Sequence, residues 1–169
     1  VVDAAYRYYK DGEISFSYTW NDTKDNVSYN GNVANSSTLY YYVPGDPRDL
    51  SRMTYSDNQF RHKLVLYGTL PTFWGFNVGL RFSGFGGSRY SLCVNGNVNG
   101  DFVSTNDLAY VYDPNDPNTP DYIREGINTI LDNPNVSGSM KKYLRNSFGK
   151  IAERNGGVNG FYGVFDLHI

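Results

Sequence analysis

The sequence predicts an all-β fold built from antiparallel strands. Three observations support this prediction. Residues that favour strands and turns are abundant, with 16 Tyr, 10 Phe and 18 Gly among 169 residues. Several segments alternate apolar and polar residues with the period of two that is typical of a half-buried strand. Short and long connections alternate between these segments. Such a sheet occurs in transmembrane β-barrels and also in soluble β-rich proteins.

The alternation of apolar and polar residues defines five strands. Residues 13–21 show it most clearly, because Ile14, Phe16 and Trp20 fall on one face while Ser, Thr and Asn fall on the other. In residues 76–84, apolar side chains again occupy every second position. The predicted strands cover residues 4–9, 13–21, 62–70, 76–84 and 161–169.

The connections between these strands favour a membrane barrel. Residues 10–12 and 71–75 form short turns, whereas residues 22–60 and 85–160 form long loops. Long structureless loops are uncommon in compact soluble domains. Tight periplasmic turns that alternate with long extracellular loops are the usual arrangement in outer-membrane barrels. We therefore expect the wall of a barrel, and a soluble sheet rich in aromatic residues remains the alternative.

The second long loop contains two segments with helical periodicity. Pro120 stands at the first turn of a helix predicted over residues 121–131. A second helix is predicted over residues 139–153, with Gly156 and the glycine after it ending the segment. We expect the apolar faces of these helices to serve in packing, as a small helical subdomain of the loop. These faces consist of Ile123, Ile127 and Ile130 in the first helix and of Met140, Leu144, Phe148 and Ile151 in the second.

A cluster of three tyrosines in the first long loop is the candidate ligand-binding region. Tyr40, Tyr41 and Tyr42 follow a stretch rich in Asn and Ser. Tyrosines in such a setting form adaptable binding surfaces, and in a rigid barrel the loops carry function. A sugar or a peptide is the expected cargo. Packing inside the loop is the alternative use of these rings.

Three ionisable residues are predicted on the polar face of the last strands. Alternation places Arg81, Asp166 and His168 away from the apolar positions. In a barrel this polar face lines the water-filled lumen. We therefore expect these side chains to face the lumen.

A calcium site is a further hypothesis. Asn97, Asn99 and Asp101 have the spacing of alternate oxygen ligands, and Asp107 could close the loop. Phe102, however, stands where such loops need Gly for their sharp turn, and no Glu occupies the twelfth position. Asn, Gly and Asp are also the residues that any turn favours.

Composition and motifs argue against several other functions. The formal net charge of −2 gives no attraction for nucleic acid. His62 and His168 do not have the spacing of metal ligands, and Cys93 has no sequence signature of a catalytic nucleophile around it. No phosphate-binding or dinucleotide-binding motif is present in the sequence. We expect a protein that binds a ligand and has no enzymatic activity.

Four segments resemble one family of bacterial proteins. "SDNQFRHKLVLYGTLP" is similar to a strand entry common in TonB-dependent outer-membrane receptors, above all the Oar-like group of Bacteroidetes-type bacteria, with Asp57, Arg61 and His62 at its characteristic places. "FSGFGGSRYSL", "NGNVNGDFVSTNDLAYV" and "GKIAERNGGVNGFYGVFDLHI" resemble later motifs of that group, in the same order. The chain departs from the pattern at three places: Arg89 replaces a proline, His168 replaces an arginine, and the Arg and Pro that usually follow the Arg-Asn pair, here Arg154 and Asn155, are absent.

The resemblance covers about two thirds of the chain and implies both a fold and a function. It implies the late part of a large barrel, of roughly 22 strands in such transporters, so we expect an incomplete chain. The whole protein would take up a nutrient, peptide or glycan across the outer membrane. Its partners would be lipid, the rest of the barrel and its plug, TonB and a surface lipoprotein. A secreted carbohydrate-binding module and a barrel for anchoring or secretion are the alternatives.

Overall fold

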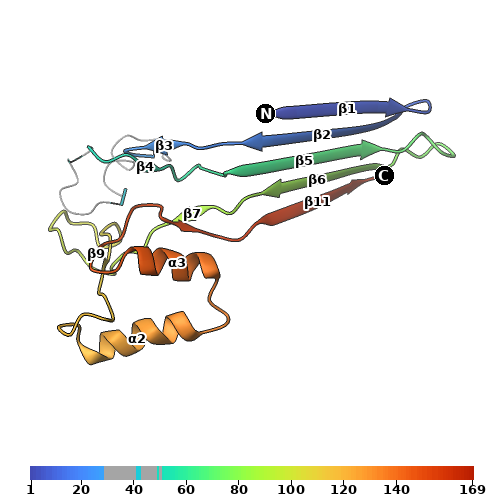
Figure 1. Cartoon of the computed structure of the whole chain (residues 1–169). Coiled ribbons are helices and arrows are strands. Elements are labelled where there is room, and N and C mark those ends of the chain that lie inside the picture. The colour runs from blue at the N-terminus through green and yellow to red at the C-terminus, as the bar shows by residue number, and fades with distance from the viewer. Residues whose placement is uncertain (29–40, 43–48, 50) are drawn as a thin grey trace. The chain divides into compact units, whose positions relative to one another are not determined.

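The computed structural model describes residues 1–28, 41–42, 49 and 51–169, and it is mostly antiparallel β-structure with two helices (Figure 1). The chain divides into two compact units. We call the first the sheet unit, formed by Val1–Asp22, Gln59–Ser88 and Gly160–Ile169. We call the second the loop unit, formed by the described parts of Thr23–Asn58 together with Arg89–Asn159. Among the described residues, no helix has the length and apolar character needed to cross a membrane.

The sheet unit is one antiparallel sheet of five strands in the order β1-β2-β5-β6-β11. This confirms the all-β, antiparallel prediction and all five predicted strands. The sheet is open, with β1 and β11 at its edges, and the described residues do not close it into a barrel. The strands are β1 (Val2–Tyr8), β2 (Gly12–Trp20), β5 (His62–Thr69), β6 (Gly79–Phe85) and β11 (Tyr162–His168).

The register of the sheet gives it one continuous apolar face. Paired residues form rows that cross all five strands, and successive rows point to opposite faces. We call apolar face the side that carries three of these rows. They are Val2–Tyr18–Leu64–Gly84–Gly163, Ala4–Phe16–Leu66–Phe82–Phe165 and Tyr6–Ile14–Gly68–Leu80–Leu167.

The opposite side, the polar face, carries the charged residues of the five strands. One of its rows pairs Tyr67 with Arg81 and Arg81 with Asp166. Because no charged residue lies on the apolar face, a slip of one residue between any two strands would mix the two faces. The Asp, Glu, Lys and Arg residues of these strands are Asp3, Arg7, Glu13, Lys63, Arg81 and Asp166.

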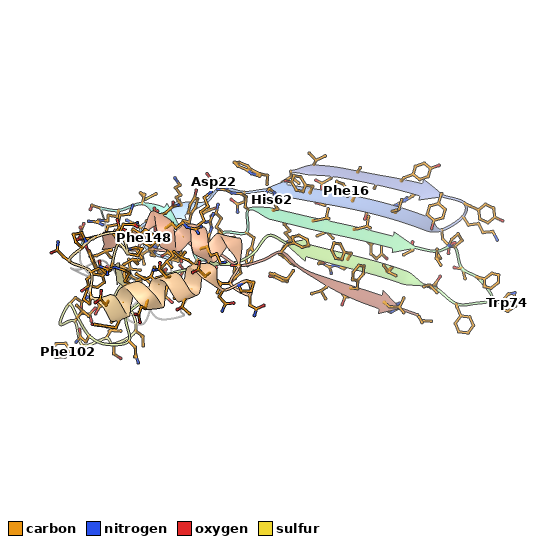
Figure 2. The ribbon with its side chains drawn as sticks, turned by 60° about the horizontal axis from the view of Figure 1, so that its bottom comes forward. Phe16, Asp22, His62, Trp74, Phe102 and Phe148 are labelled. Carbon is orange, nitrogen blue, oxygen red and sulfur yellow. The ribbon has the colours of Figure 1, made fainter. Side chains whose placement is uncertain are left out.

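The sheet unit has no apolar core of its own among the described residues. Its large apolar side chains stay exposed, for example 71% for Phe165 and 63% for Leu167. No other layer of the sheet unit covers them, as Figure 2 shows for the strand that carries Phe16. Aromatic rings of the sheet unit itself lie flat along part of the apolar face. The rings of Phe82 and Phe161 occupy the space that a Cβ atom on Gly84 would need.

Both tight turns lie at the same end of the sheet. In the turn between β5 and β6, Phe73 and Phe76 form a bridge, and Trp74 and Gly75 both have the positive φ that a two-residue hairpin turn favours. The predicted strand 76–84 therefore starts too early, because Phe76 belongs to the turn and β6 begins at Gly79. The long connections leave from the other end, where Trp20 pairs with His62.

The loop unit is folded, although its sequence was predicted to be loop with one helical insertion. Short antiparallel pairs join segments that are distant in sequence: β3 with β4, β7 with β10 and β8 with β9. Its elements are β3 (Lys24–Asp25), β4 (Thr54–Tyr55), β7 (Arg89–Tyr90), β8 (Tyr110–Val111), α2 (Asp121–Asp132), α3 (Gly138–Asn146), β9 (Lys150–Ile151) and β10 (Gly157–Val158).

The two helices share one apolar core, which confirms their predicted packing role. Ile127 of α2 packs with Tyr143 and Leu144 of α3. The Tyr143 hydroxyl donates to the carbonyl oxygen of Glu153 and accepts from the Leu92 N–H at 3.3 Å. Burial raises the pKa of Tyr143 to about 12, so this donor keeps its proton at neutral pH.

The second helix was predicted to run to residue 153, and this boundary is wrong. Helix α3 ends at Asn146, and Ser147 caps it. Gly149 then takes a φ of 71°, which turns the chain into β9. The helical spacing of Phe148 and Ile151 was misleading, because Phe148 packs on the core after the helix has ended and Ile151 is exposed on β9.

Candidate ligand-binding site

A buried arginine ties the two long loops together in the loop unit. The side chain of Arg154 is 5% exposed. Its Nε donates to Thr54 Oγ1 at 2.8 Å, and its Nη2 donates to the carbonyl oxygen of Asp25 at 3.0 Å. The same nitrogen forms an ion pair with the Asp25 carboxylate. Because Asp25 precedes Arg154 by 129 residues, this contact fixes the fold of the unit at long range.

Asn155 continues the same network. Its side-chain amide donates to the Tyr55 carbonyl oxygen at 2.8 Å and to the Asp57 carboxylate. Its backbone N–H donates to Ser91 Oγ at 2.9 Å. Asn155 is 2% exposed and has a φ of 58°, a backbone conformation that Asn tolerates better than most residues. A short polar residue is therefore required here for both backbone and side-chain reasons.

Next to this network lies a pocket of about 450 Å³, within the range typical of small-ligand sites. Tyr41 and Tyr42 line it, so two of the three predicted ligand-binding tyrosines are brought together there. The third, Tyr40, lies outside the described residues. The other lining residues are Asn26, Asp49, Arg52, Met53, Thr54, Leu108, Lys150, Ile151, Ala152, Glu153 and Arg154.

One nitrogen of Arg154 lacks a hydrogen-bond partner among the described residues. Arg154 Nη1 is buried and has no acceptor among the described residues. A buried N–H without a partner costs about 1–3 kcal/mol, so native structures contain few of them. Arg154 lines the pocket, but its Nη1 atom is closed to solvent and so is out of reach of a molecule in the pocket as the side chains stand.

The electrostatics around Arg154 are balanced by its partner carboxylate. Partial burial raises the pKa of Asp25, but hydrogen bonds from Ser56, Ser28 and Arg154 outweigh it and lower that pKa below its ordinary value. Asp25 is therefore ionised at neutral pH and neutralises Arg154. Burial also raises the pKa of Tyr42, and the neighbouring Cys93 and Asp57 add to the effect.

The residues predicted to face the lumen lie together on the polar face of the sheet unit. Arg81 and Asp166 are direct cross-strand partners on β6 and β11. His168, opposite Gly79 on the same two strands, lies on the same face and lines a shallow depression with them. Opposite charges that face each other across two strands stabilise their pairing.

The four residues proposed for calcium do meet, but their oxygens accept from N–H groups. Asn97 Oδ1 accepts from the Gly100 N–H at 2.8 Å, and Asp107 Oδ2 accepts from the Val98 N–H at 2.6 Å. Asn99 donates its side-chain amide to Asp101. An ion would have to displace these donors, so the arrangement fits a self-stabilised loop better than a cation site. The described residues contain no group of three or more His, Cys, Asp or Glu side chains that could hold a metal.

Comparisons with known families, curated proteins and solved structures gave no match to this chain. The resemblance to TonB-dependent receptors thus rests on its motifs alone. The structure adds one relation between two of these motifs, since Asp57 of the first and Asn155 of the last are hydrogen-bonded.

The sequence reasoning missed the arginine that forms the centre of the site. Arg154 and Asn155 were noted as part of a motif, without a role. The available signal was weak: a charged and an amide residue directly before two glycines, in a segment with several other charged residues. Their partners Asp25 and Thr54 could not be found, because they lie about a hundred or more positions away in sequence and in no periodic pattern.

Proposed function

We propose that this chain forms part of the wall of an outer-membrane β-barrel of the TonB-dependent, Oar-like kind. In this proposal the sheet unit contacts lipid through its apolar face and water through its polar face. The loop unit lies on the cell surface, where it binds a ligand. The whole receptor would then admit the ligand with the help of its plug, TonB and a surface lipoprotein, as the resemblance implies.

The exposed apolar face is the observation that carries the proposal. Rows without charged residues, rich in Phe, Leu and Tyr, cross all five strands, and no layer of the sheet unit covers their exposed side chains. In water, each such side chain forgoes about 1.5–3 kcal/mol of burial free energy. Hydrocarbon would supply that burial without a second sheet, and the polar face opposite would meet a wet lumen.

The two ends of the sheet support the same proposal. Exposed aromatic rings gather at the turn end, where Phe73 and Trp74 stack with ring centroids 4.7 Å apart and Trp74 is 86% exposed. At the other end, Trp20 and Phe161 are exposed. Aromatic residues at both limits of an apolar band are characteristic of membrane barrels. Short turns at one end and long connections at the other fit the periplasmic and outer sides.

Spin labels on neighbouring residues of β11 test the proposal. Phe165→Cys and Asp166→Cys, each in a Cys93→Ser background, place labels at the same depth on opposite faces. We expect the label at 165 to collide with oxygen dissolved in lipid, and the label at 166 to collide with a water-soluble nickel complex. The measurement uses outer-membrane vesicles from cells that produce the protein.

Other results would contradict the barrel. A label at 165 that is shielded from both reagents would indicate a second layer of protein, as in a soluble sandwich. A protein that is monomeric in buffer without detergent would favour the secreted module in the same way.

A further inference from the structure

The apolar face of the sheet has a gap that its own side chains leave open. Gly68 lies between Ile14 and Leu80 in one row of this face. Apart from its chain neighbours, a Cβ atom on Gly68 would have one described atom within 4 Å, the Glu13 carbonyl oxygen at 3.7 Å. Other glycines of the face are covered by aromatic rings: Gly12 by Tyr8, Gly84 by Phe82 and Phe161, and Gly163 by Phe82.

This gap belongs to a hollow of about 370 Å³ with an apolar wall. Glu13 and Thr69 also line the hollow, but alternation directs their side chains to the polar face. There the Glu13 carboxylate pairs with Arg7 at 3.2 Å. The lining residues that alternation places on the apolar face itself are Tyr8, Ile14, Gly68, Leu70, Val78 and Leu80.

A second hollow, of about 520 Å³, continues toward the turn end of the sheet and shares Leu70 and Val78 with the first. We call the two hollows together the Gly68 groove. Lys10 lines its turn end, and Lys10 Nζ lies 5.2 Å from the centre of the Tyr9 ring. Lys10 has a φ of 60°, a conformation that turns usually give to Gly or Asn. The other residues of the second hollow are Tyr9, Pro71, Thr72, Phe73 and Phe76.

The carboxylate next to Lys10 in the sequence is engaged on the other side of the sheet. Asp11 lines the depression on the polar face, where its carboxylate accepts from the Thr72 N–H at 3.1 Å and from the Thr72 hydroxyl. These hydrogen bonds, more than the charge of Lys10, lower the pKa of Asp11. The Gly68 groove thus runs along apolar side chains and ends at a cation.

An apolar groove that ends at a cation matches the chemistry of an anionic phospholipid. Lipid tails are as apolar as the side chains of a membrane protein, so a lipid is held at one place only by close packing and by polar contacts. The groove supplies packing contacts for an acyl chain, and Lys10 attracts an anionic headgroup. We propose that the Gly68 groove holds one acyl chain of an anionic phospholipid whose phosphate lies at Lys10.

This inference rests on the proposed function, because the apolar face meets lipid only in a membrane, and it adds a lipid partner to that function. The test counts the lipids that stay with the protein. The complete protein, purified in a mild detergent, is equilibrated with equal amounts of phosphatidylglycerol and phosphatidylethanolamine and separated from free micelles. Mass spectrometry then gives the moles of each lipid per mole of protein. We expect at least about threefold more phosphatidylglycerol, because one lysine favours the anionic headgroup.

Two variants separate the acyl chain from the headgroup. Gly68→Ile fills the gap, and the strand has room for this side chain. It should retain at least about threefold less phosphatidylglycerol, because the chain loses its packing contacts. Lys10→Gln removes the cation and should retain the two lipids equally. Gly79→Ile makes the same substitution on the polar face, Lys63→Gln removes a cation at the other end of the sheet, and both controls should behave as the original protein does.

Three results would overturn the inference. They are equal retention of the two lipids by the original protein, equal retention of phosphatidylglycerol by Gly68→Ile and Gly79→Ile, and an undiminished excess of phosphatidylglycerol in Lys10→Gln. Lys10→Gln decides the matter even where Gly68→Ile does not fold, because Lys10 is exposed in a turn.

The lipid count and the spin-label measurement can fail separately. A barrel without this site gives equal retention of the two lipids, while the label at 165 still collides with oxygen in lipid. A soluble sheet that binds this lipid gives the excess of phosphatidylglycerol, while the label at 165 is shielded.

Discussion

The amide of Asn155 donates to the carboxylate of Asp57 across 98 residues of sequence, inside the loop unit. Asn155 is almost fully buried, and its amide also donates to the Tyr55 carbonyl oxygen. Both residues belong to motifs through which the sequence resembles a receptor family. The contact holds the first long loop against the second. It therefore explains the presence of Asp57 and Asn155 in these motifs by their role in the fold, without any ligand.

An exchange of the two polar groups tests this contact. Asn155→Asp places two carboxylates face to face and removes the shorter of the hydrogen bonds to the Tyr55 carbonyl, so we expect a loss of about 2–3 kcal/mol in the free energy of unfolding. Adding Asp57→Asn restores one amide opposite one carboxylate and should recover part of this loss. Urea unfolding followed by near-ultraviolet circular dichroism measures both. A double variant no more stable than Asn155→Asp alone would contradict direct coupling.

The two faces of the sheet predict opposite tolerance to charge. Phe165→Lys places a cation on the apolar face, whereas Val164→Lys places the same cation on the polar face of the same strand. In a membrane barrel the first should cost about 2–4 kcal/mol near the bilayer centre, and the second should cost little. We expect Phe165→Lys to be depleted from the outer-membrane fraction and Val164→Lys to accumulate normally. Equal accumulation of the two variants would count against lipid contact.

The sheet could be predicted from sequence because each strand carries its own evidence. Alternation within Gly12–Trp20 already decides which side chains share a face, and the neighbouring strands add the same pattern. Alternation then excludes alignments shifted by one residue, since such a shift would separate Arg81 and Asp166 from the face of Glu13, but it does not exclude a shift of two. The start of β6 was misplaced because Phe76 continues the alternation into a turn.

The loop unit could not be predicted in the same way. Its strands have two residues each, which is too short for any periodicity to be recognised. It is held instead by single side-chain contacts between distant segments, such as Arg154 with Asp25. Of the candidate site, the sequence indicated the tyrosines from their composition alone. The charged residues around them, including Arg52, became visible only after the loops were folded.

The lowered pKa of Asp25 predicts a loss of stability in acid. A carboxyl whose pKa is lower in the folded state stabilises the fold above its ordinary pKa, and this contribution disappears as the pH falls through the lowered value. For Asp25 the contribution is therefore complete at neutral pH and is lost below about pH 4. Thermal unfolding midpoints measured from pH 7 to pH 3 should fall, and the fall should be smaller in Asp25→Asn.

Glu125→Gln is the control for this measurement, because it removes one exposed carboxylate from α2 without touching the Arg154 network. Its pH profile should follow that of the original protein. A profile of Asp25→Asn with an equally steep fall would show that other carboxyl groups cause the acid sensitivity.

Cys93 should react slowly with thiol reagents in spite of its exposed surface. The thiol itself is partly shielded from water, and the carboxylate of Asp107 lies nearby. Both effects disfavour the thiolate and raise the pKa of the thiol to about 11. At pH 8 only about one thiol in a thousand is then the reactive thiolate. We expect maleimide labelling at least tenfold slower than that of Asp166→Cys in a Cys93→Ser background, whose thiol is exposed on the sheet, and a rate that rises steadily up to pH 10. Equal rates at pH 8 would show that the thiol is not held in its protonated form, and Cys93 would then have to be reconsidered as a nucleophile.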